Sequence, residues 1–295
     1  MKNLIRFDWA VKRLLRNKAN FGILEGFLSE LLMEDIKIES VLESEGNRQT
    51  ADDKTNRVDI LVQNSIGELI IIEIQNNYMT DYLLRMYYGT SKIITDNMVI
   101  GMPYSMVKKV ISINIVYFDL GQGEDYVYHG TTNFIGIHKK DVLKLSNTEE
   151  GIYHTLDIAK IYPEYYIIKV NQFNETSENT LDEWIHFFKN QEVKEDTKAK
   201  GLKEAKEELD VMKLSPIERK EYEAYITDWR DNYGVIVGNY NKGKIEGMIE
   251  GEKKGEIEER KDNIIKMHKE GISIEIIARV TGLNVEEIDR IIENE

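Results

Sequence analysis

Two apolar runs in the first third of the chain have acidic side chains at matching ends. Residues 58–62 read Val-Asp-Ile-Leu-Val, and residues 69–74 read Leu-Ile-Ile-Ile-Glu-Ile. Residues 64–67 between them, Asn-Ser-Ile-Gly, are typical of a turn. The pattern predicts two antiparallel strands, and the second is apolar on both faces, as in a central strand that is buried on both sides.

The register of this hairpin decides whether its acidic side chains share a face of the sheet. If the turn is centred on Ile66, Asp59 lies directly opposite Glu73 and the loop has an odd number of residues. Gln75 follows Glu73 by two residues and then shares that face. A turn centred between Ser65 and Ile66 would instead separate Asp59 from Glu73. We therefore predict the odd-length loop.

Two opposed carboxylates at the end of apolar strands repel each other unless a cation lies between them. Hard oxygen ligands suit Mg²⁺ or Mn²⁺, and the main-chain carbonyl of Ile74 is a further oxygen donor. A bound divalent ion can activate water and stabilise charge on a phosphate during hydrolysis. The alternative is a pair of strand-end carboxylates that face solvent or pair with Arg57 or Lys54, with Gln75 as a polar strand-end residue.

The remaining pattern alternates between helices and strands. Asp8 is placed to cap a helix over residues 9–15, and a second helix is predicted over residues 21–33. Further strands are predicted over residues 36–42, 110–118, 126–134 and 165–170, the last at an edge of the sheet, with a helix over residues 80–97. From residue 181 onward the pattern is helical, and Pro216 after Ser215 marks a helix start. This order predicts an α/β fold.

We predict three parts along the chain. An α/β core covers residues 1–175, a helical extension covers residues 176–238, and residues 239–295 form a glycine-repeat charged helix and a terminal helical hairpin. Each interior glycine costs such a helix about 1 kcal/mol relative to alanine. The last helix is acidic, so phosphates would repel it. We therefore expect the C-terminal helices to bind a second copy of the chain or a protein partner.

Composition limits the compartment and the classes of ligand. The chain has no cysteine, which excludes disulfides, thiolate zinc sites and a cysteine nucleophile. Its first residues lack the apolar stretch of a secretory signal and its apolar runs are strand-sized, so we expect a cytoplasmic protein with no membrane span. The net charge of −14 argues against a general nucleic-acid coat protein, but residues 1–20 are basic and leave room for a local DNA-binding surface.

The hairpin residues resemble the PD-(D/E)XK nuclease superfamily, and more narrowly its recombination-promoting nuclease and transposase-like branch. The matching pieces are residues 7–12, residues 53–59, the Glu73-x-Gln75 pattern, and the Tyr-Tyr-Gly of residues 87–89. The resemblance implies a restriction-endonuclease-like core with a mixed β-sheet flanked by helices, followed by a C-terminal helical extension. It also implies Mg²⁺-dependent cleavage of DNA, with Asp59 and Glu73 as catalytic residues and metal ligands.

The wider superfamily usually has a lysine at the position of Gln75. The recombination-promoting branch has a glutamine there, as this chain does. An amide cannot take up a proton or carry charge, so Gln75 can only orient water or phosphate. Lys12 and Lys54 are candidates for the missing positive charge. Asp8 and Glu25 are candidate additional acids of the site, and their alternatives are a helix cap and an exposed helix glutamate.

Arg85, Tyr88 and Lys92 recur at helical spacing and share one helix face. That face is either a solvated surface or a contact with DNA phosphates, in which Tyr88 stacks or donates a hydrogen bond. Taken with these patterns, the resemblance implies a metal-dependent DNA endonuclease associated with recombination or mobile elements. The alternative is a catalytically inert DNA- or protein-binding descendant of the same fold.

Overall fold

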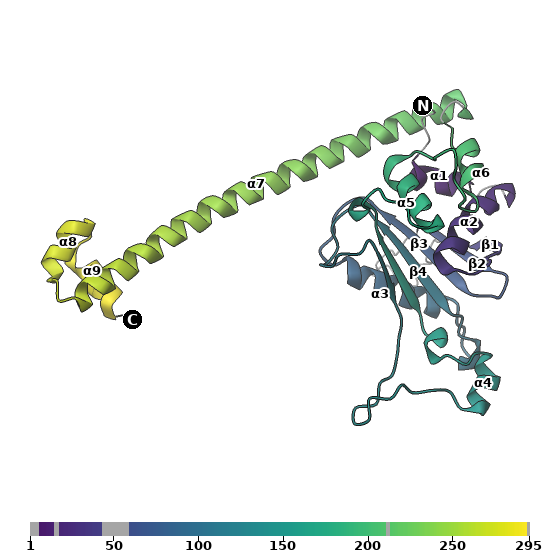
Figure 1. Cartoon of the computed structure of the whole chain (residues 1–295), viewed down its shortest axis with the longest axis horizontal. Coiled ribbons are helices and arrows are strands. Elements are labelled where there is room, and N and C mark those ends of the chain that lie inside the picture. Colours follow the sequence, from purple (N-terminus) through teal and green to yellow (C-terminus); the bar gives the residue numbers. More distant parts are fainter. Residues whose placement is uncertain (1–5, 15–17, 43–58, 211–212, 294–295) are drawn as a thin grey trace. The chain divides into compact units, whose positions relative to one another are not determined.

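The computed structural model describes residues 6–14, 18–42, 59–210 and 213–293. The chain divides into two compact units, Met1–Ala224 and Tyr225–Glu295. The first unit contains a mixed β-sheet with helices packed against it, and the second is helical (Figure 1). The predicted α/β class with a mixed sheet and a C-terminal helical extension is confirmed.

The sheet has six strands in the order β1-β2-β3-β4-β6-β5. The strands are β1 Ile38–Leu42, β2 Ile60–Asn64, β3 Leu69–Gln75, β4 Val110–Val116, β5 Val127–Gly130 and β6 Glu164–Lys169. β3, β4 and β6 are parallel, whereas β1, β2 and β5 join the sheet through antiparallel pairs. The prediction of an edge strand over residues 165–170 is wrong, because β5 pairs with the outer side of β6 and takes the edge itself.

The β2–β3 hairpin has the predicted odd-length loop, which consists of Ser65, Ile66 and Gly67. The amide of Gly67 donates to the carbonyl of Asn64 at 3.0 Å, and the amide of Asn64 donates to the carbonyl of Glu68 at 3.0 Å. Gly67 has a φ of 88°, the left-handed conformation that three-residue hairpin loops place on glycine. The ladder continues through Ile60 opposite Ile72, so the predicted register is confirmed.

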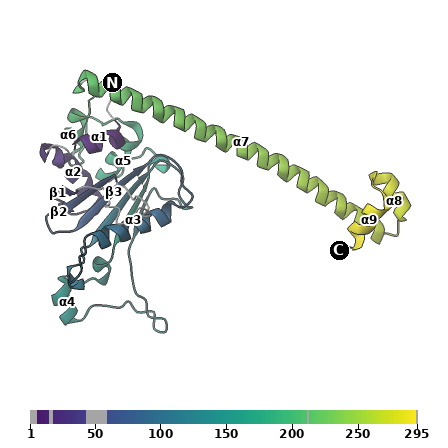
Figure 2. The same ribbon diagram turned by 180° about the vertical axis from the view of Figure 1, so that it is seen from behind.

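Helices cover the sheet on both sides. Helix α3, Tyr82–Asp96, lies across the face formed by Leu61, Ile71 and Val110, and its Ile93 packs into that cluster (Figure 2). The opposite side is covered by α1 Phe7–Leu14, α2 Phe21–Leu32, α5 Thr180–Asn190 and α6 Leu202–Glu208. An aromatic core joins these helices, with the ring centres of Phe7 and Phe188 4.8 Å apart. Such close-packed apolar contacts fix both layers against the sheet.

Short helices fill the connections. They are η1 Lys18–Asn20, η2 Tyr104–Met106, α4 Asn147–Tyr153, η3 Ile158–Ile161 and η4 Val170–Gln172. The long connection between β5 and β6 contains α4, which is labelled in Figure 2, and also η3. One predicted cap is wrong: α1 begins at Phe7, so Asp8 lies within the first helical turn rather than before it.

The second unit is built on the long helix α7, Pro216–Lys269, which begins in the first unit at the predicted Pro216 and continues through the glycine repeat. Helices α8 Ile274–Thr281 and α9 Val285–Glu293 follow. Ile264, Ile277 and Ile288 form their buried core. The predicted capping box at α9 is present, since the amide of Glu287 donates to Asn284 Oδ1 at 2.8 Å. Within the described residues, no helix is long and apolar enough to cross a membrane.

Candidate active site

The carboxyl ends of the parallel strands lie together at one end of the sheet. We call this end the carboxyl edge, which is distinct from the outermost strands β1 and β5. β3 ends at Gln75, which lies opposite Val116 of β4, and Val116 in turn lies opposite Lys169 of β6. β2 runs in the opposite direction, so Asp59 at its start lies at the same edge. Open α/β sheets usually bind ligands outside the carboxyl ends of their parallel strands. This edge is therefore where a site is expected from topology alone.

Asp59 and Glu73 occupy neighbouring positions there. Because Ile60 lies opposite Ile72, the register brings Asp59 opposite Glu73 on the face covered by α3. The carboxylate of Asp59 accepts a hydrogen bond from the amide of Ile74 at 2.9 Å. Burial raises the pKa of Glu73 to about 7 against the opposing effect of Arg85, and the charge of Asp59 adds to the increase. The two acids therefore interact, and the edge favours an added positive charge.

Arg85 of α3 is the cation nearest to Glu73 among the described ion pairs. Its Nη2 atom lies 3.5 Å from Oε2 of Glu73. Its Nη1 atom donates to the sulfur of Met79 at 3.7 Å, and its buried Nε atom has no hydrogen-bond partner among the described residues. Arginine forms its strongest bonds as a two-pronged donor to carboxylate or phosphate. Arg85 is thus held by weak contacts and keeps unused donor capacity beside the acids.

Two residues of this site were not identified from the sequence. Asn114 lies beside Glu73 in the β3–β4 ladder, and the hydroxyl of Tyr82 donates to its Oδ1 atom at 3.1 Å. Nδ2 of Asn114 donates to Ser112 Oγ at 3.0 Å. Burial and the nearby charge of Glu73 raise the pKa of Tyr82. A usable sequence signal existed, since Ser112 and Asn114 are the two polar residues of an otherwise apolar central strand.

Gln75 lies at the predicted place. It is two residues beyond Glu73 in β3, so it points to the same face. Its Nε2 atom donates to the main-chain carbonyl of Asn77 at 3.1 Å, and the side chain is partly buried. That bond uses the donor side of the amide and turns it toward the main chain.

Asp8 belongs to a buried network at the same sheet edge. Its carboxylate pairs with Arg6 at 3.1 Å and accepts a hydrogen bond from Nδ2 of Asn76 at 2.8 Å. Successive side chains along an extended chain point to opposite faces. Asn76 directly follows Gln75, so its side chain points away from the face that contains Gln75 and Glu73. Asp8 therefore ties α1 to the end of β3 from the side opposite to Glu73.

Glu25 lies away from these residues. Its carboxylate accepts a hydrogen bond from the amide of Ile38 at 2.9 Å and pairs with Lys37 at 3.1 Å. Ile38 lies opposite Asn64, which is at the other end of β2 from Asp59. Glu25 thus fixes α2 to the start of β1, and the structure does not bring it to the site.

The remaining candidate residues are the lysines predicted to supply positive charge and the residues of α3 predicted to contact DNA. Lys54 and the side chain of Lys12 lie outside the described residues. Lys92 pairs with Asp96 of the same helix at 3.1 Å. Tyr88 is 41% exposed, which leaves its ring accessible to a ligand. The face of α3 predicted to contact DNA therefore contains one residue at the acids, Arg85, and one accessible ring.

The oxygen donors at this edge fit a hard divalent cation. Asp59 and Glu73 supply two carboxylates, and the carbonyl of Ile74 and the amide oxygen of Gln75 are neighbouring neutral donors. Within the described ranges, no group of three or more His, Asp or Glu side chains is placed to hold a metal ion. Mg²⁺ commonly uses one or two carboxylates and completes its shell with water and substrate phosphate. The donor set therefore fits Mg²⁺ or Mn²⁺ in an open site, where water and substrate phosphate supply the remaining ligands.

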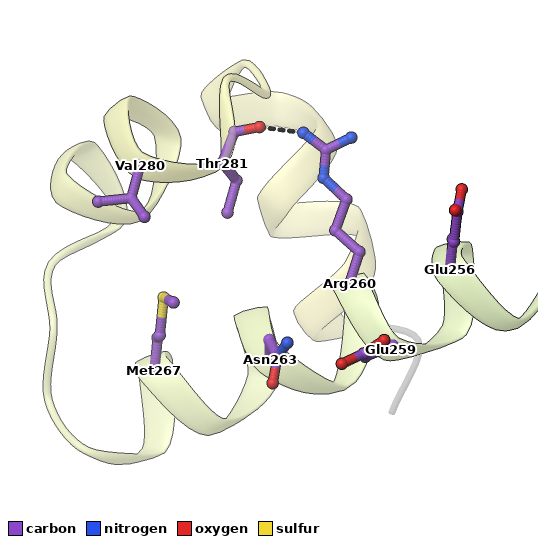
Figure 3. Close-up of a pocket in the computed structure, with 7 residues that line it drawn as sticks. All are labelled: Glu256, Glu259, Arg260, Asn263, Met267, Val280 and Thr281. Carbon is purple, nitrogen blue, oxygen red and sulfur yellow. Dashed lines mark hydrogen bonds between the residues drawn. The ribbon is translucent and has the colours of Figure 1, made fainter.

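A hollow of about 420 Å³ lies in the C-terminal unit between α7 and α8 (Figure 3). Its lining includes Glu256, Glu259 and Arg260. The guanidinium of Arg260 already donates to the carbonyl of Thr281. The two glutamates would repel a phosphate, so this hollow does not suit nucleic acid.

One comparison with known proteins gives a match. A family model described as PD-(D/E)XK nuclease family transposase matches residues 5–238, which is most of the chain and includes the whole sheet. Searches of curated proteins and of solved structures gave no match.

Proposed function

The chain belongs to the PD-(D/E)XK nuclease family transposases, and on this premise we propose that it is a metal-dependent DNA endonuclease that acts in recombination or on mobile elements. The observation that supports this most is the Asp59–Glu73 pair at the carboxyl edge of the sheet. Burial raises the pKa of Glu73 to about 7 despite Arg85, and Asp59 contributes to the increase, so the pair is left short of positive charge.

We propose that Asp59 and Glu73 hold Mg²⁺, with Mn²⁺ as a substitute. When bound, the ion supplies an activated water and offsets the charge that develops on the phosphate. Asp59 is already oriented, because its carboxylate accepts the amide hydrogen of Ile74. Glu73 is oriented by burial against α3 and by the 3.5 Å contact with Arg85.

Gln75 and Arg85 have separate roles in this proposal. Gln75 orients the attacking water or the scissile phosphate through its amide, which can neither gain nor lose a proton. Arg85 contacts Glu73 at 3.5 Å, and its guanidinium would be able to donate to phosphate oxygens if the charge of the two acids were offset by a bound cation. The water oxygen forms a new P–O bond as a P–O bond of the DNA backbone breaks, and the leaving sugar oxygen takes up a proton to become a hydroxyl.

DNA contacts beyond the scissile phosphate are proposed for the α3 surface. Tyr88 offers an accessible ring for stacking or for a hydrogen bond to the backbone. Lys92 pairs with Asp96, so it would have to exchange that partner for a phosphate. We assign it the weaker contribution of the two.

The C-terminal helices are proposed to bind a second copy of the chain or a protein partner. Exposed apolar side chains recur along α7, including Tyr233 and Tyr240, which are 57% and 69% exposed. Soluble proteins usually cover such surfaces by association. Light scattering of the full chain beside Tyr240→Asp tests self-association: a smaller assembly in the variant supports binding to a second copy, and an unchanged mass contradicts it.

The nuclease proposal is tested with supercoiled plasmid, Mg²⁺ or Mn²⁺, and the parent protein beside Asp59→Ala and Glu73→Ala. Nicking or linearisation by the parent, lost in both variants and in EDTA, supports the proposed site. Equal cutting by all three proteins would show that the acids are wrongly assigned. Metal-independent DNA binding without cutting by any of the three would favour the inert descendant of the fold.

A further inference from the structure

Lys169, the last residue of β6, is a buried lysine whose side chain has no hydrogen-bond partner among the described residues. Its side chain is 1% exposed. Its Nζ atom is fully buried, and no described residue makes a hydrogen bond to it. A buried ammonium normally requires an anion or several acceptors, because removing it from water costs several kcal/mol. An unpaired lysine in this position therefore requires an explanation.

The position of Lys169 relates it to the proposed site. Val116 lies opposite Gln75 on one side and opposite Lys169 on the other, and all three strands are parallel. Paired positions in neighbouring strands point to the same face, so Lys169 and Gln75 share the face that also contains Glu73. Two strand spacings separate them, which is about 10 Å between Cα atoms. Lys169 thus lies at the same sheet edge as the acids.

The surroundings of Lys169 offset only part of the cost of burial. Its Nζ atom lies 5.5 Å from the ring centre of Tyr128. A cation–π contact of this kind is attractive, but it does not replace an anion or several hydrogen-bond acceptors. The amide of Asp125 donates to the hydroxyl of Tyr128 at 3.1 Å, so the exposed loop that precedes β5 is fixed to this ring.

That loop lies at the surface of the molecule. Gly121 and Gly123 have φ values of 63° and 150°, and residues 121–125 are exposed. On the side toward Glu73, by contrast, Tyr82, Val116 and Phe118 form a buried apolar cluster. An approach to Lys169 from the loop side would avoid this apolar cluster.

We propose that Lys169 binds a backbone phosphate of the DNA strand, next to the phosphate that is cut, when the 121–125 loop shifts. This proposal rests on the nuclease function above and adds a residue to it. Gln75 cannot supply the positive charge that a lysine would bring, and Lys169 supplies one from another strand of the same face. A phosphate would pair with the Lys169 ammonium, for which no described residue provides an anion, and this pairing would offset the cost of burying the ammonium.

The test is the salt dependence of DNA binding by the full chain in EDTA, where no cutting occurs. A fluorescent duplex oligonucleotide is titrated with the parent, Lys169→Met, Lys169→Arg and Lys108→Met. Each phosphate contact contributes about 0.9 to the slope of log affinity against log salt. We expect that slope to fall by about 1 in Lys169→Met and to stay at the parental value in Lys169→Arg.

Lys108→Met is the matched control, because it removes the same charge from the opposite end of the sheet, where Lys108 donates to Gln63 at 2.9 Å. A slope that falls equally in Lys108→Met and Lys169→Met would overturn the proposal, since only net charge would matter. An unchanged slope in a folded Lys169→Met would also overturn it. The ammonium of the parent protein would then have only the Tyr128 ring as a partner among the described residues.

A measurement on the parent protein covers the case in which Lys169→Met does not fold. The ¹⁵Nζ resonance of Lys169, assigned by its loss in Lys169→Arg, is followed while the duplex is added in EDTA. A shift of that resonance supports the phosphate contact, and a resonance that stays in place overturns it. Neither experiment depends on cutting, so a failed plasmid assay and a failed Lys169 assay remain distinguishable.

Discussion

The two ends of the β-sheet differ in how completely their charged side chains are paired. At the amino end of the parallel strands, Glu164 is the centre of a paired network. It pairs with Lys109, and Nε2 of His129 lies 2.9 Å from its Oε2 atom. At the carboxyl end, Glu73 and Asp59 oppose each other, Arg85 contacts Glu73 at 3.5 Å, and Nζ of Lys169 has no hydrogen-bond partner among the described residues.

This difference appears in the acidity of the two glutamates. Burial works against the charge of Glu164, but the bonds from Lys109 and His129 outweigh it and lower the pKa of that carboxyl. Burial raises the pKa of Glu73 to about 7, because Arg85 compensates only in part. Charges that stabilise a fold are usually paired, whereas binding sites keep unpaired groups for the ligand. The comparison favours a stabilising role for the charges at the amino end and supports the binding role proposed for the carboxyl end.

Replacing each glutamate by glutamine gives the largest expected contrast, in plasmid cleavage. Glu73→Gln removes a proposed metal ligand, and we expect cleavage to fall by at least about 10³-fold, since several kcal/mol of charge stabilisation is lost. Glu164→Gln removes an ion pair far from the acids, and cleavage should stay within about twofold of the parent. Equal losses in both variants would remove the distinction between the ends.

The same two variants should separate in stability, with opposite signs. Glu73 has a raised pKa in the fold, so its contribution is complete below about pH 4.5 and is lost as pH rises through about 7. At pH 8 without metal the ionised carboxyl costs about 3 kcal/mol, which Glu73→Gln should recover in the free energy of unfolding.

Glu164→Gln should instead lower that free energy by about 2 kcal/mol, because a charged hydrogen-bond acceptor is lost. Urea denaturation at pH 8 in EDTA measures both effects. A destabilised Glu73→Gln would mean that the Arg85 contact dominates and that the carboxyl end is not short of positive charge.

The pH dependence of cleavage gives a finer test at the carboxyl end. Glu73 must lose its proton to bind a metal, so cleavage at subsaturating Mg²⁺ should rise as pH passes through about 7. Saturating Mg²⁺ should move this rise to lower pH, because metal and proton compete for the carboxylate. Initial rates at two Mg²⁺ concentrations measure the shift, and a midpoint independent of Mg²⁺ would speak against Glu73 as a ligand.

The smallest effect is expected from the residues behind the acids. Tyr82→Phe removes the hydrogen bond to Asn114 and should cost about 1 kcal/mol of stability and less than about tenfold in cleavage. Tyr126→Phe is its control, since it removes a 2.8 Å bond to Asp182 outside the site. Similar losses of stability with a loss of cleavage only in Tyr82→Phe would assign Tyr82 a positioning role. Full cleavage in Tyr82→Phe would exclude that role.

The hairpin was predictable from the sequence because its constraints are local. A short turn with glycine and two apolar runs determine the register, and the register brings Asp59 opposite Glu73. The same local reasoning found the helix that contains Arg85, but it could not place the guanidinium against Glu73, since that contact joins separate elements.

Features that depend on distant parts of the chain were missed. β6 has an ordinary apolar pattern, and only its pairing with β5 keeps it from the edge of the sheet. Glu25 is separated from the acids by the way β1 pairs with β2, which its own helix does not reveal. Lys169 lies near the site only because β4 and β6 are parallel and in register.

The carboxyl edge is proposed to bind a divalent cation through Asp59 and Glu73. Calorimetric titration of the DNA-free protein with Mn²⁺ and Mg²⁺ tests it without any need for the natural target sequence. We expect saturable binding by the parent and by Glu164→Gln, and none by Asp59→Ala or Glu73→Gln. Binding that persists in both Asp59→Ala and Glu73→Gln, or that is absent from the parent, would contradict the account.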